Sequence, residues 1–186
     1  MKLRQFVMIF LTFFLSLSAE AGLLIDLGVA FESSNYQFED KGSIARTGFS
    51  GGIYFQASKK WWIGWNIFNA SFASTMEADK ANYSSSEMGP SFKYEWGSDQ
   101  IYFFKGTYNL NIESTATIGS NAEKIQGSSY LVGFGVQPQI YDGVRLGISF
   151  NYYSGSHAKK VVNNVQSSVS YSNTWIFPSI NLSFQF

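Results

Sequence analysis

The chain has 186 residues, with 13 Lys and Arg against 13 Asp and Glu, so its formal net charge is zero. This balance leaves no large basic surface for a nucleic acid and excludes that class of partner. Cysteine is absent, which excludes disulfide bonds and thiolate metal sites. Aromatic residues make up 18% of the chain, with 17 Gly and only 3 Pro, a composition that favours closely packed strands over helices.

The N-terminus has the three parts of an export signal. Lys2 and Arg4 are basic, an apolar run extends from Phe6 to about Leu17, and Ala19-Glu20-Ala21 has the small-x-small pattern of a cleavage site. The run is shorter than the roughly 20 apolar residues that a spanning helix needs. We therefore expect a signal peptide at 1–21, cleaved after export through the Sec pathway, and one mature domain at 22–186.

Period-two alternation of apolar and polar residues predicts eight strands in the mature chain. They lie at about 23–33, 44–57, 61–72, 84–96, 100–113, 125–140, 144–153 and 168–186. The apolar positions are mostly Leu, Ile, Val and Phe and suit a lipid-facing surface, with the polar positions inside a barrel. A soluble exported barrel or sandwich is the alternative, and its outward face should be polar.

Two of these strands are ambiguous. In the strand at 61–72, Trp62 and Phe68 fall among the inward positions. In the strand at 100–113, Ile101 and Phe103 do the same. Uninterrupted alternation in this second strand places Ile112 outward and Asn111 inward.

The connections between the predicted strands alternate in length. Short turns are expected at 58–60, 97–99 and 142–143, and longer polar links at about 34–43, 73–83, 114–124 and 154–166. This alternation puts every short turn and both mature termini on one side, as in outer-membrane barrels with short periplasmic turns and longer extracellular loops. The even strand number closes the sheet without an exposed edge.

Aromatic residues form two candidate girdles at the membrane interfaces. Those near the short turns are Trp61, Trp62, Trp96, Tyr102, Tyr141 and Phe186. Those near the long links are Tyr36, Phe72, Tyr83, Tyr108, Tyr130, Tyr152 and Tyr171.

The last predicted strand alternates up to the terminal residue through Ile180, Leu182, Phe184 and Phe186. On this pattern and the architecture above, residues 22–186 resemble the small eight-stranded outer-membrane barrels, such as the OmpA transmembrane domain, OmpX and OmpW. The resemblance implies an all-β, eight-stranded, antiparallel, up-and-down transmembrane β-barrel in the bacterial outer membrane. It also implies a monomer that meets periplasmic chaperones, the barrel assembly machinery that reads the terminal pattern, and outer-membrane lipids with lipopolysaccharide. It implies no cofactor.

Charged residues at inward positions are the main candidates for a functional interior. Four acids and four bases share this parity: Asp26, Glu32, Arg46, Glu87, Lys93, Glu95, Lys105 and Arg145. An eight-stranded barrel is just wide enough for side chains to fill it, so a balanced network would plug the lumen. The alternative reading of the same charges is a proton or ion path, or a gate.

The single histidine, His157, lies beside Ser156 in a predicted long link. Lipid A deacylases are barrels of similar size in the same membrane. Their motif has Ser two residues after the His, but that position is Lys159 here. Adjacency alone does not produce a Ser-His-acid geometry, so we interpret His157 as an exposed loop residue. The acidic residues show no metal-ligand spacing, and no metal site is predicted.

Three functions follow, in order of preference. The first is a non-enzymatic outer-membrane barrel with a polar, plugged lumen, whose long loops serve envelope structure, adhesion or surface recognition. The second, by resemblance to OmpW, is a narrow channel for small hydrophobic compounds, with an apolar funnel drawn from Leu24, Phe68, Ile101, Phe103, Leu131 and Phe177. The third, a lipid-A-modifying enzyme, requires a role for His157.

Overall fold

The computed structural model describes residues 22–36, 42–76, 79–118, 121–162 and 165–186, so the predicted signal peptide at 1–21 lies outside the described residues. Nine strands follow in chain order: β1 (Leu23–Tyr36), β2 (Gly42–Ser58), β3 (Trp61–Met76), β4 (Asp79–Trp96), β5 (Tyr102–Ile118), β6 (Asn121–Val136), β7 (Gln139–Tyr141), β8 (Val144–Val162) and β9 (Val165–Gln185). A short 3-10 turn, η1 (Ser98–Gln100), joins β4 to β5. Within the described ranges, no helix has the length and apolar character needed to cross a bilayer.

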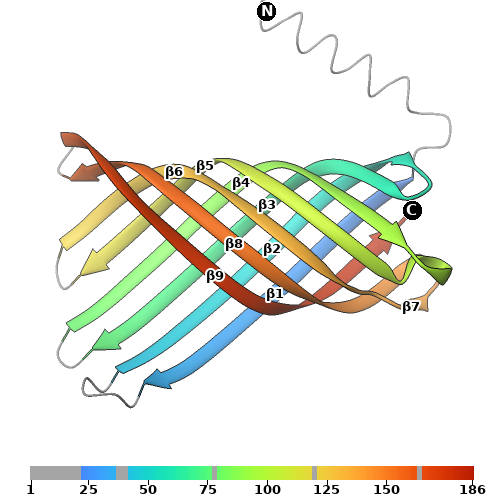
Figure 1. Cartoon of the computed structure of the whole chain (residues 1–186), viewed down its shortest axis with the longest axis horizontal. Coiled ribbons are helices and arrows are strands. Elements are labelled where there is room, and N and C mark those ends of the chain that lie inside the picture. Colours follow the sequence, from blue (N-terminus) through green and yellow to red (C-terminus); the bar gives the residue numbers. More distant parts are fainter. Residues whose placement is uncertain (1–21, 37–41, 77–78, 119–120, 163–164) are drawn as a thin grey trace, which may run out of the picture.

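Eight of these strands form a closed antiparallel ring (Figure 1). Each strand pairs with its neighbours in the chain, β6 pairs with β8, and β9 pairs with β1. The ninth strand, β7, follows β6 after Gln137 and Pro138, where proline has no N–H to donate to the ladder. The predicted eight-stranded up-and-down barrel is confirmed, with β6 and β7 together corresponding to its sixth strand.

The outward face of the ring carries a band of exposed apolar side chains. Ile53 is 54% exposed and Phe134 is 61% exposed, although residues of this kind are usually buried in water-soluble proteins. Such a band is the surface that a barrel presents to lipid. Other members are Val29, Phe49, Ile63, Ile67, Met88, Leu110, Ile148, Phe150, Ile176 and Ile180.

The inward face is polar except where a few apolar and aromatic side chains point inward. The structure also shows which way the ambiguous residues of the two strands face. Trp62, Phe68 and Phe103 are all buried inside the barrel. In β5 the prediction for Ile112 and Asn111 was wrong: Ile112 is buried and Asn111 is exposed. The pairing of β5 shifts register between Asn109 and Ile112, so a bulge at this point reverses the alternation.

The two ends of the barrel differ. At the end that we call the turn end, β2–β3, β4–β5 and β7–β8 are joined by short links, and Leu23 N–H donates to the Phe186 carbonyl at 3.0 Å. Gly97 (φ 88°) and Gly143 (φ 69°) adopt left-handed backbone conformations in two of these links, where glycine avoids the Cβ clash. The opposite end, the rim, holds the connections of β1–β2, β3–β4, β5–β6 and β8–β9.

Three of the four long loops predicted at the rim were wrong, and the centre of the fourth, residues 37–41 of the link at 34–43, lies outside the described residues. Most of residues 73–83, 114–124 and 154–166 belong to strands, and only 77–78, 119–120 and 163–164 lie outside the described residues there. The ring strands have 14 to 21 residues, whereas about 9–11 are enough to span a bilayer. Polar Ser, Thr and Asn stretches were read as loops, but they continue the paired sheet beyond the apolar band.

The seam between β1 and β9 is paired only over its turn-end half. Its register runs from Leu24 opposite Gln185 to Ala30 opposite Ser179 and then stops. The next residue of β9 is Pro178, which cannot donate a backbone hydrogen bond. Beyond this point β1 pairs with β2 and β9 pairs with β8, and in Figure 1 both rim ends lie at the left of the view, that of β9 at the top and that of β1 at the bottom.

The aromatic girdles are correct in part. Near the rim, Tyr108, Tyr130 and Tyr152 are exposed on the outer face. At the turn end, Trp61, Tyr102, Tyr141 and Phe186 are exposed as well. Three assignments were wrong, because Trp62 is buried inside and Phe72 and Tyr83 line an inner pocket described below. The side chains of Tyr36 and Tyr171 lie outside the described residues.

Candidate functional site: the barrel interior

A network of five charged residues fills the interior near the turn end. Lys105 Nζ lies 2.9 Å from Asp26 Oδ2, and Lys93 Nζ lies 3.5 Å from Asp26 Oδ1. Lys93 also approaches Glu95 Oε1 at 3.4 Å, and Arg145 Nη1 approaches Glu95 Oε2 at 3.3 Å. Each acid thus contacts two bases, and the cluster contains three bases for two acids.

Neutral side chains form the remaining hydrogen bonds of this network. The indole N–H of Trp62 donates to Glu95 Oε2 at 2.9 Å, and Gln137 Nε2 donates to Glu95 Oε1 at 2.6 Å. Ser183 Oγ donates to Asp26 Oδ1 at 2.7 Å, and Lys93 donates to Gln137 Oε1 at 2.9 Å. Full hydrogen bonding of this kind is what makes buried charges tolerable in a low-dielectric interior.

Small polar side chains fill the middle of the barrel. Ser149 Oγ lies 2.8 Å from Ser179 Oγ, and Asn181 Nδ2 donates to Ser149 Oγ at 2.9 Å. On the facing strands, Ser91 Oγ lies 2.8 Å from Thr107 Oγ1 and 3.0 Å from Tyr54 Oη. Glycines make room for them: a Cβ on Gly28 would lie 2.5 Å from Ser50 Oγ.

Glu87 is a buried carboxylate that is held by neutral donors. Tyr153 Oη donates to Glu87 Oε1 at 2.7 Å, Asn109 Nδ2 donates to Oε2 at 3.0 Å, and Ser129 Oγ donates to the same oxygen. No Lys or Arg of the described residues lies within ion-pair distance of it. The turn-end network has one more base than acids, so adding Glu87 makes the numbers of buried acids and bases equal. Glu87 nevertheless belongs to a separate cluster.

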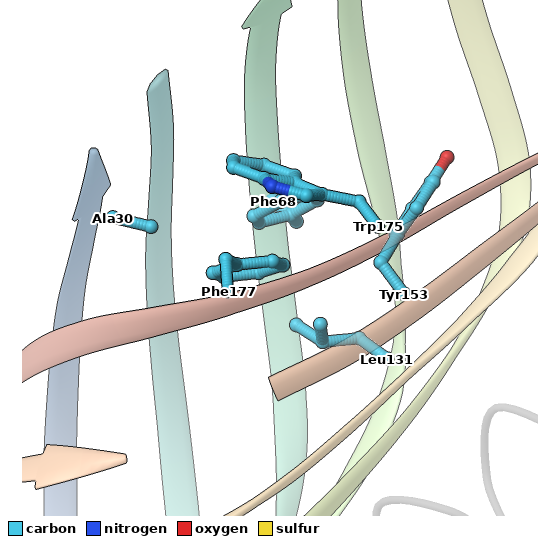
Figure 2. Close-up of a cluster of buried hydrophobic side chains, with 6 residues drawn as sticks. All are labelled: Ala30, Phe68, Leu131, Tyr153, Trp175 and Phe177. Carbon is cyan, nitrogen blue, oxygen red and sulfur yellow. The ribbon is translucent and has the colours of Figure 1, made fainter. Parts of the chain in front are cut away.

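A stack of aromatic rings lies inside the barrel (Figure 2), and one member of the cluster, Tyr153, is the donor to Glu87. The centroids of Trp175 and Phe177 are 3.9 Å apart, and Phe68 stacks on Phe177 at 6.1 Å. Tyr153 joins them at 5.6 Å from Phe68, and Leu131 and Ala30 complete the buried cluster. Trp175 and Phe177 face inward because Ile176 and Ile180 of the same strand face outward.

At the rim, an ion pair joins two facing residues of β1 and β2, and a hydrogen bond from β9 reaches it across the unpaired part of the seam. Arg46 Nη1 lies 3.6 Å from Glu32 Oε2, and the Trp175 indole N–H donates to the same oxygen at 2.6 Å. The guanidinium also lies over the rings of Phe72 (5.1 Å) and Trp175 (5.9 Å). The Glu32 and Arg46 side chains are 35% and 27% exposed, so this pair is partly in water.

A pocket of about 310 Å³ opens beside this ion pair. Tyr153 and Trp175 of the aromatic stack belong to its wall, so the stack forms part of the boundary of the pocket. Other lining residues are Arg46, Ala70, Ser71, Phe72, Tyr83, Ser85, Ser172 and Asn173.

The eight charged residues chosen from the sequence fall into three groups. Asp26, Lys93, Glu95, Lys105 and Arg145 meet in the turn-end network, Glu87 lies alone with neutral donors, and Glu32 pairs with Arg46 at the rim. The four residues chosen as an assembly signal, Ile180, Leu182, Phe184 and Phe186, lie at the outward positions of the β9 end.

The interpretation of His157 as an exposed loop residue was wrong. His157 lies in β8 opposite Gly127, is 1% exposed, and meets the Tyr83 ring edge-on with the centroids 6.2 Å apart. Burial lowers the pKa of His157 below its usual value. Its neighbour Ser156 is exposed and points to the other face, so the two side chains do not form a catalytic pair.

The sequence interpretation missed the pocket residues Phe72, Tyr83, Ser85 and Trp175. The signal was available as parity, since Phe72 continues the inward series of Phe68 and Ala70. This parity was not used because the predicted strand ended at Phe72, where a loop at 73–83 was expected.

No family model matches the chain, and no curated protein gives a significant match. Solved structures with a similar fold include the outer membrane protein OprG of Pseudomonas aeruginosa, at 12% identity over 90% of this chain and 96% of that one, with a TM-score of 0.48. Ail, the attachment invasion locus protein of Yersinia pestis, matches at 16% identity over 90% and 99%, with a TM-score of 0.45. Neisserial surface protein A matches at 15% identity over 89% and 97%, with a TM-score of 0.46. At these identities the likeness concerns the fold alone.

Proposed function

We propose that this chain is a non-enzymatic, integral outer-membrane barrel with a closed interior, and that its rim serves envelope structure or recognition at the cell surface. The observation that carries the proposal is the combination of an apolar exterior with an interior filled in layers. The exterior suits lipid, and the filled interior leaves the rim as the part available to partners.

The layers support a plug more than a pore. Ion pairs and hydrogen bonds fill the turn-end half, and the aromatic stack of Phe68, Trp175 and Phe177 lies above them. Passage of an ion would require the Lys93 and Glu95 contacts to separate, and both side chains are fully buried. Truncating one partner of such a pair exposes an uncompensated charge at high cost.

The geometry gives less support to a channel for hydrophobic compounds. The apolar residues proposed for its funnel do not form one surface, because Leu24 packs with Tyr54 and Trp62 while Phe68, Leu131 and Phe177 belong to the aromatic stack. Charged and polar side chains such as Asp26 and Asn66 lie buried within the same interior. An apolar solute would have to cross these polar layers without replacement hydrogen bonds.

Surface recognition in this proposal involves sheet rather than loops. The rim strands carry exposed polar side chains beyond the apolar band, among them Ser84, Thr115 and Lys159. Lys159 and the half-buried Lys160, which pairs with Glu123 at 2.6 Å, are placed where phosphates of lipopolysaccharide could be met. In this proposal periplasmic chaperones accompany the chain, and the barrel assembly machinery inserts it into the membrane. The machinery recognises the C-terminal residues Ile180, Leu182, Phe184 and Phe186.

Planar-bilayer recordings of the purified protein test the closed interior. We expect no steady conductance from the wild type. The control is the variant Lys93→Ala/Glu95→Ala/Trp62→Ala, which removes three neighbouring side chains at the turn end and should raise the frequency of openings. A steady, ion-selective conductance from the wild type would overturn the proposal in favour of a channel.

Cell fractionation tests the location. The protein should sediment with outer membranes and migrate faster on a gel without heating than after heating, as folded barrels do. Recovery in the soluble periplasmic fraction would contradict the membrane assignment. Unchanged lipid A after overexpression is expected, and a new acylation pattern would contradict the non-enzymatic assignment.

A further inference from the structure

The rim pocket combines a flat apolar wall with unused hydrogen-bond donors. Phe72, Tyr83, Tyr153 and Trp175 come from β3, β4, β8 and β9 and enclose a volume of about 310 Å³. This volume is at the lower end of the range for small-molecule sites, which are usually apolar pockets with a few placed polar groups.

Arg46 presents the main group of donors. Its guanidinium lies over the rings of Phe72 and Trp175, at 5.1 Å and 5.9 Å from their centroids, and these contacts restrict its position. Its Nη1 faces Glu32 at 3.6 Å, which is longer than a hydrogen bond, and among the described side chains no other acceptor contacts it. The remaining N–H groups of Arg46 can therefore donate to a ligand.

Ser85 is a second and independent sign of a ligand. Its side chain lines the pocket, the residue is only 6% exposed, and its hydroxyl makes no hydrogen bond of standard geometry among the described residues, although it lies near the Tyr83 hydroxyl. A buried hydroxyl without a partner costs free energy, and a ligand oxygen or bound water would remove that cost. Asn173 adds an amide to the same wall.

From these contacts we infer that the rim pocket binds a small organic anion with a flat, apolar body, such as an aryl carboxylate. The body lies against the rings of Tyr83 and Tyr153, the carboxylate accepts from the N–H groups of Arg46 that have no acceptor among the described side chains, and Ser85 supplies a further hydrogen bond. A bidentate Arg–carboxylate contact is the strongest that this donor set can form. A cationic ligand is disfavoured because Arg46 already occupies the faces of Phe72 and Trp175. The inference rests on the proposed recognition role of the rim and specifies its ligand.

Calorimetric titration of the full-length mature protein in detergent micelles tests this inference, with empty micelles as the blank. The probes are 2-naphthoate, the neutral isostere 2-naphthamide, and the cation 2-naphthylmethylammonium. We expect naphthoate to bind about tenfold more tightly than naphthamide, as a charge-assisted contact allows, and the ammonium probe to bind most weakly.

Two matched variants should change naphthoate affinity in opposite directions. Arg46→Gln removes the guanidinium and should abolish the preference for the acid over the amide. Glu32→Gln keeps the shape of its side chain, removes a competing negative charge and should raise naphthoate affinity several-fold. Misfolding cannot produce an increase, so the pair of variants remains informative, and heat-modifiable gel migration verifies that each barrel is folded.

Equal binding of naphthoate and naphthamide, a preference for the ammonium probe, or an unchanged preference in Arg46→Gln would each overturn the inference. These outcomes are independent of conductance. A closed barrel that fails to bind naphthoate refutes the pocket and leaves the proposed function standing, whereas a conducting barrel refutes the proposed function.

Discussion

The turn-end half and the rim half of this barrel use the same strands but are stabilised differently. In the turn-end half every strand of the eight-stranded ring pairs with two neighbours, and buried charges such as Asp26 and Lys93 have both opposite charges and neutral hydrogen-bond partners. In the rim half β1 and β9 separate beyond Ala30, Glu87 is held by neutral donors, and the Ser85 hydroxyl makes no hydrogen bond of standard geometry among the described residues.

This difference suggests a division of roles along one interior. The turn-end half seals the barrel, because its charged groups are matched by neighbours that the fold supplies, although the buried amide of Asn66 has no hydrogen-bond partner among the described residues. The rim half keeps a pocket and unused donors, which cost stability and are typical of a site where a ligand completes the contacts. The aromatic stack of Phe68, Trp175 and Phe177 forms the boundary between the two halves.

The largest difference between the halves should appear when an acid is removed from each. Asp26→Leu leaves Lys93 and Lys105 without this shared carboxylate, and we expect a loss of about 3–5 kcal/mol in the free energy of unfolding. Glu32→Gln at the rim breaks a partly exposed pair and should cost less than about 1 kcal/mol. Urea unfolding in lipid vesicles measures both, and similar losses would mean that the two halves are not energetically distinct.

A smaller effect is expected at the seam. Pairing of β1 with β9 stops at Ser179, next to Pro178, so Pro178→Val restores a backbone donor at the boundary. We expect slower amide hydrogen exchange in β1 from Phe31 onward and a gain in stability of about 1 kcal/mol or less. Unchanged exchange in β1 would show that strand twist, and not the missing donor, separates the two strands.

The smallest effect concerns pH. Because burial lowers the pKa of His157 below its usual 6.5, the folded rim binds a proton less readily than the opened rim does. Neutral His157 therefore makes its full contribution to the stability of the folded rim above about pH 6.5. This stability is lost as the pH falls toward the lower pKa that His157 has in the folded state. Amide exchange at Gly127, the partner of His157 in the ladder, should show easier opening below this pH than in His157→Gln at the same pH. Parallel pH profiles for the two proteins would contradict this.

Alternation in the sequence predicted the eight strands because a barrel wall with lipid on one face and a polar interior on the other imposes a period of two. It did not predict where the strands end. Above the apolar band both faces of the wall are polar, so Ser71, Ser84 and Thr115 carry no period that separates sheet from loop. It also missed the bulge in β5, because Leu110 and Asn111 are both compatible with either parity.

For the interior, parity indicated which charged residues point inward but not which of them meet. Pairing depends on strand order and stagger around the ring, which bring Lys105 of β5 to Asp26 of β1 across the lumen. Trp175 was missed as a functional residue for a similar reason. Its contacts with Glu32 and Arg46 bridge segments about 130 positions or more apart, and no local pattern reports them.

The most direct test of the sealed half is single-cysteine labelling. The chain has no native cysteine, so only the introduced thiol can react. Ser183→Cys and Ser149→Cys place thiols in the filled interior, and Asn173→Cys places one in the wall of the rim pocket. With a charged, membrane-impermeant thiol reagent added to both sides of folded protein in vesicles, we expect Asn173→Cys to react and the other two to remain unmodified. Labelling of Ser183→Cys and Ser149→Cys as fast as Asn173→Cys would reveal a water-filled lumen and contradict the closed interior.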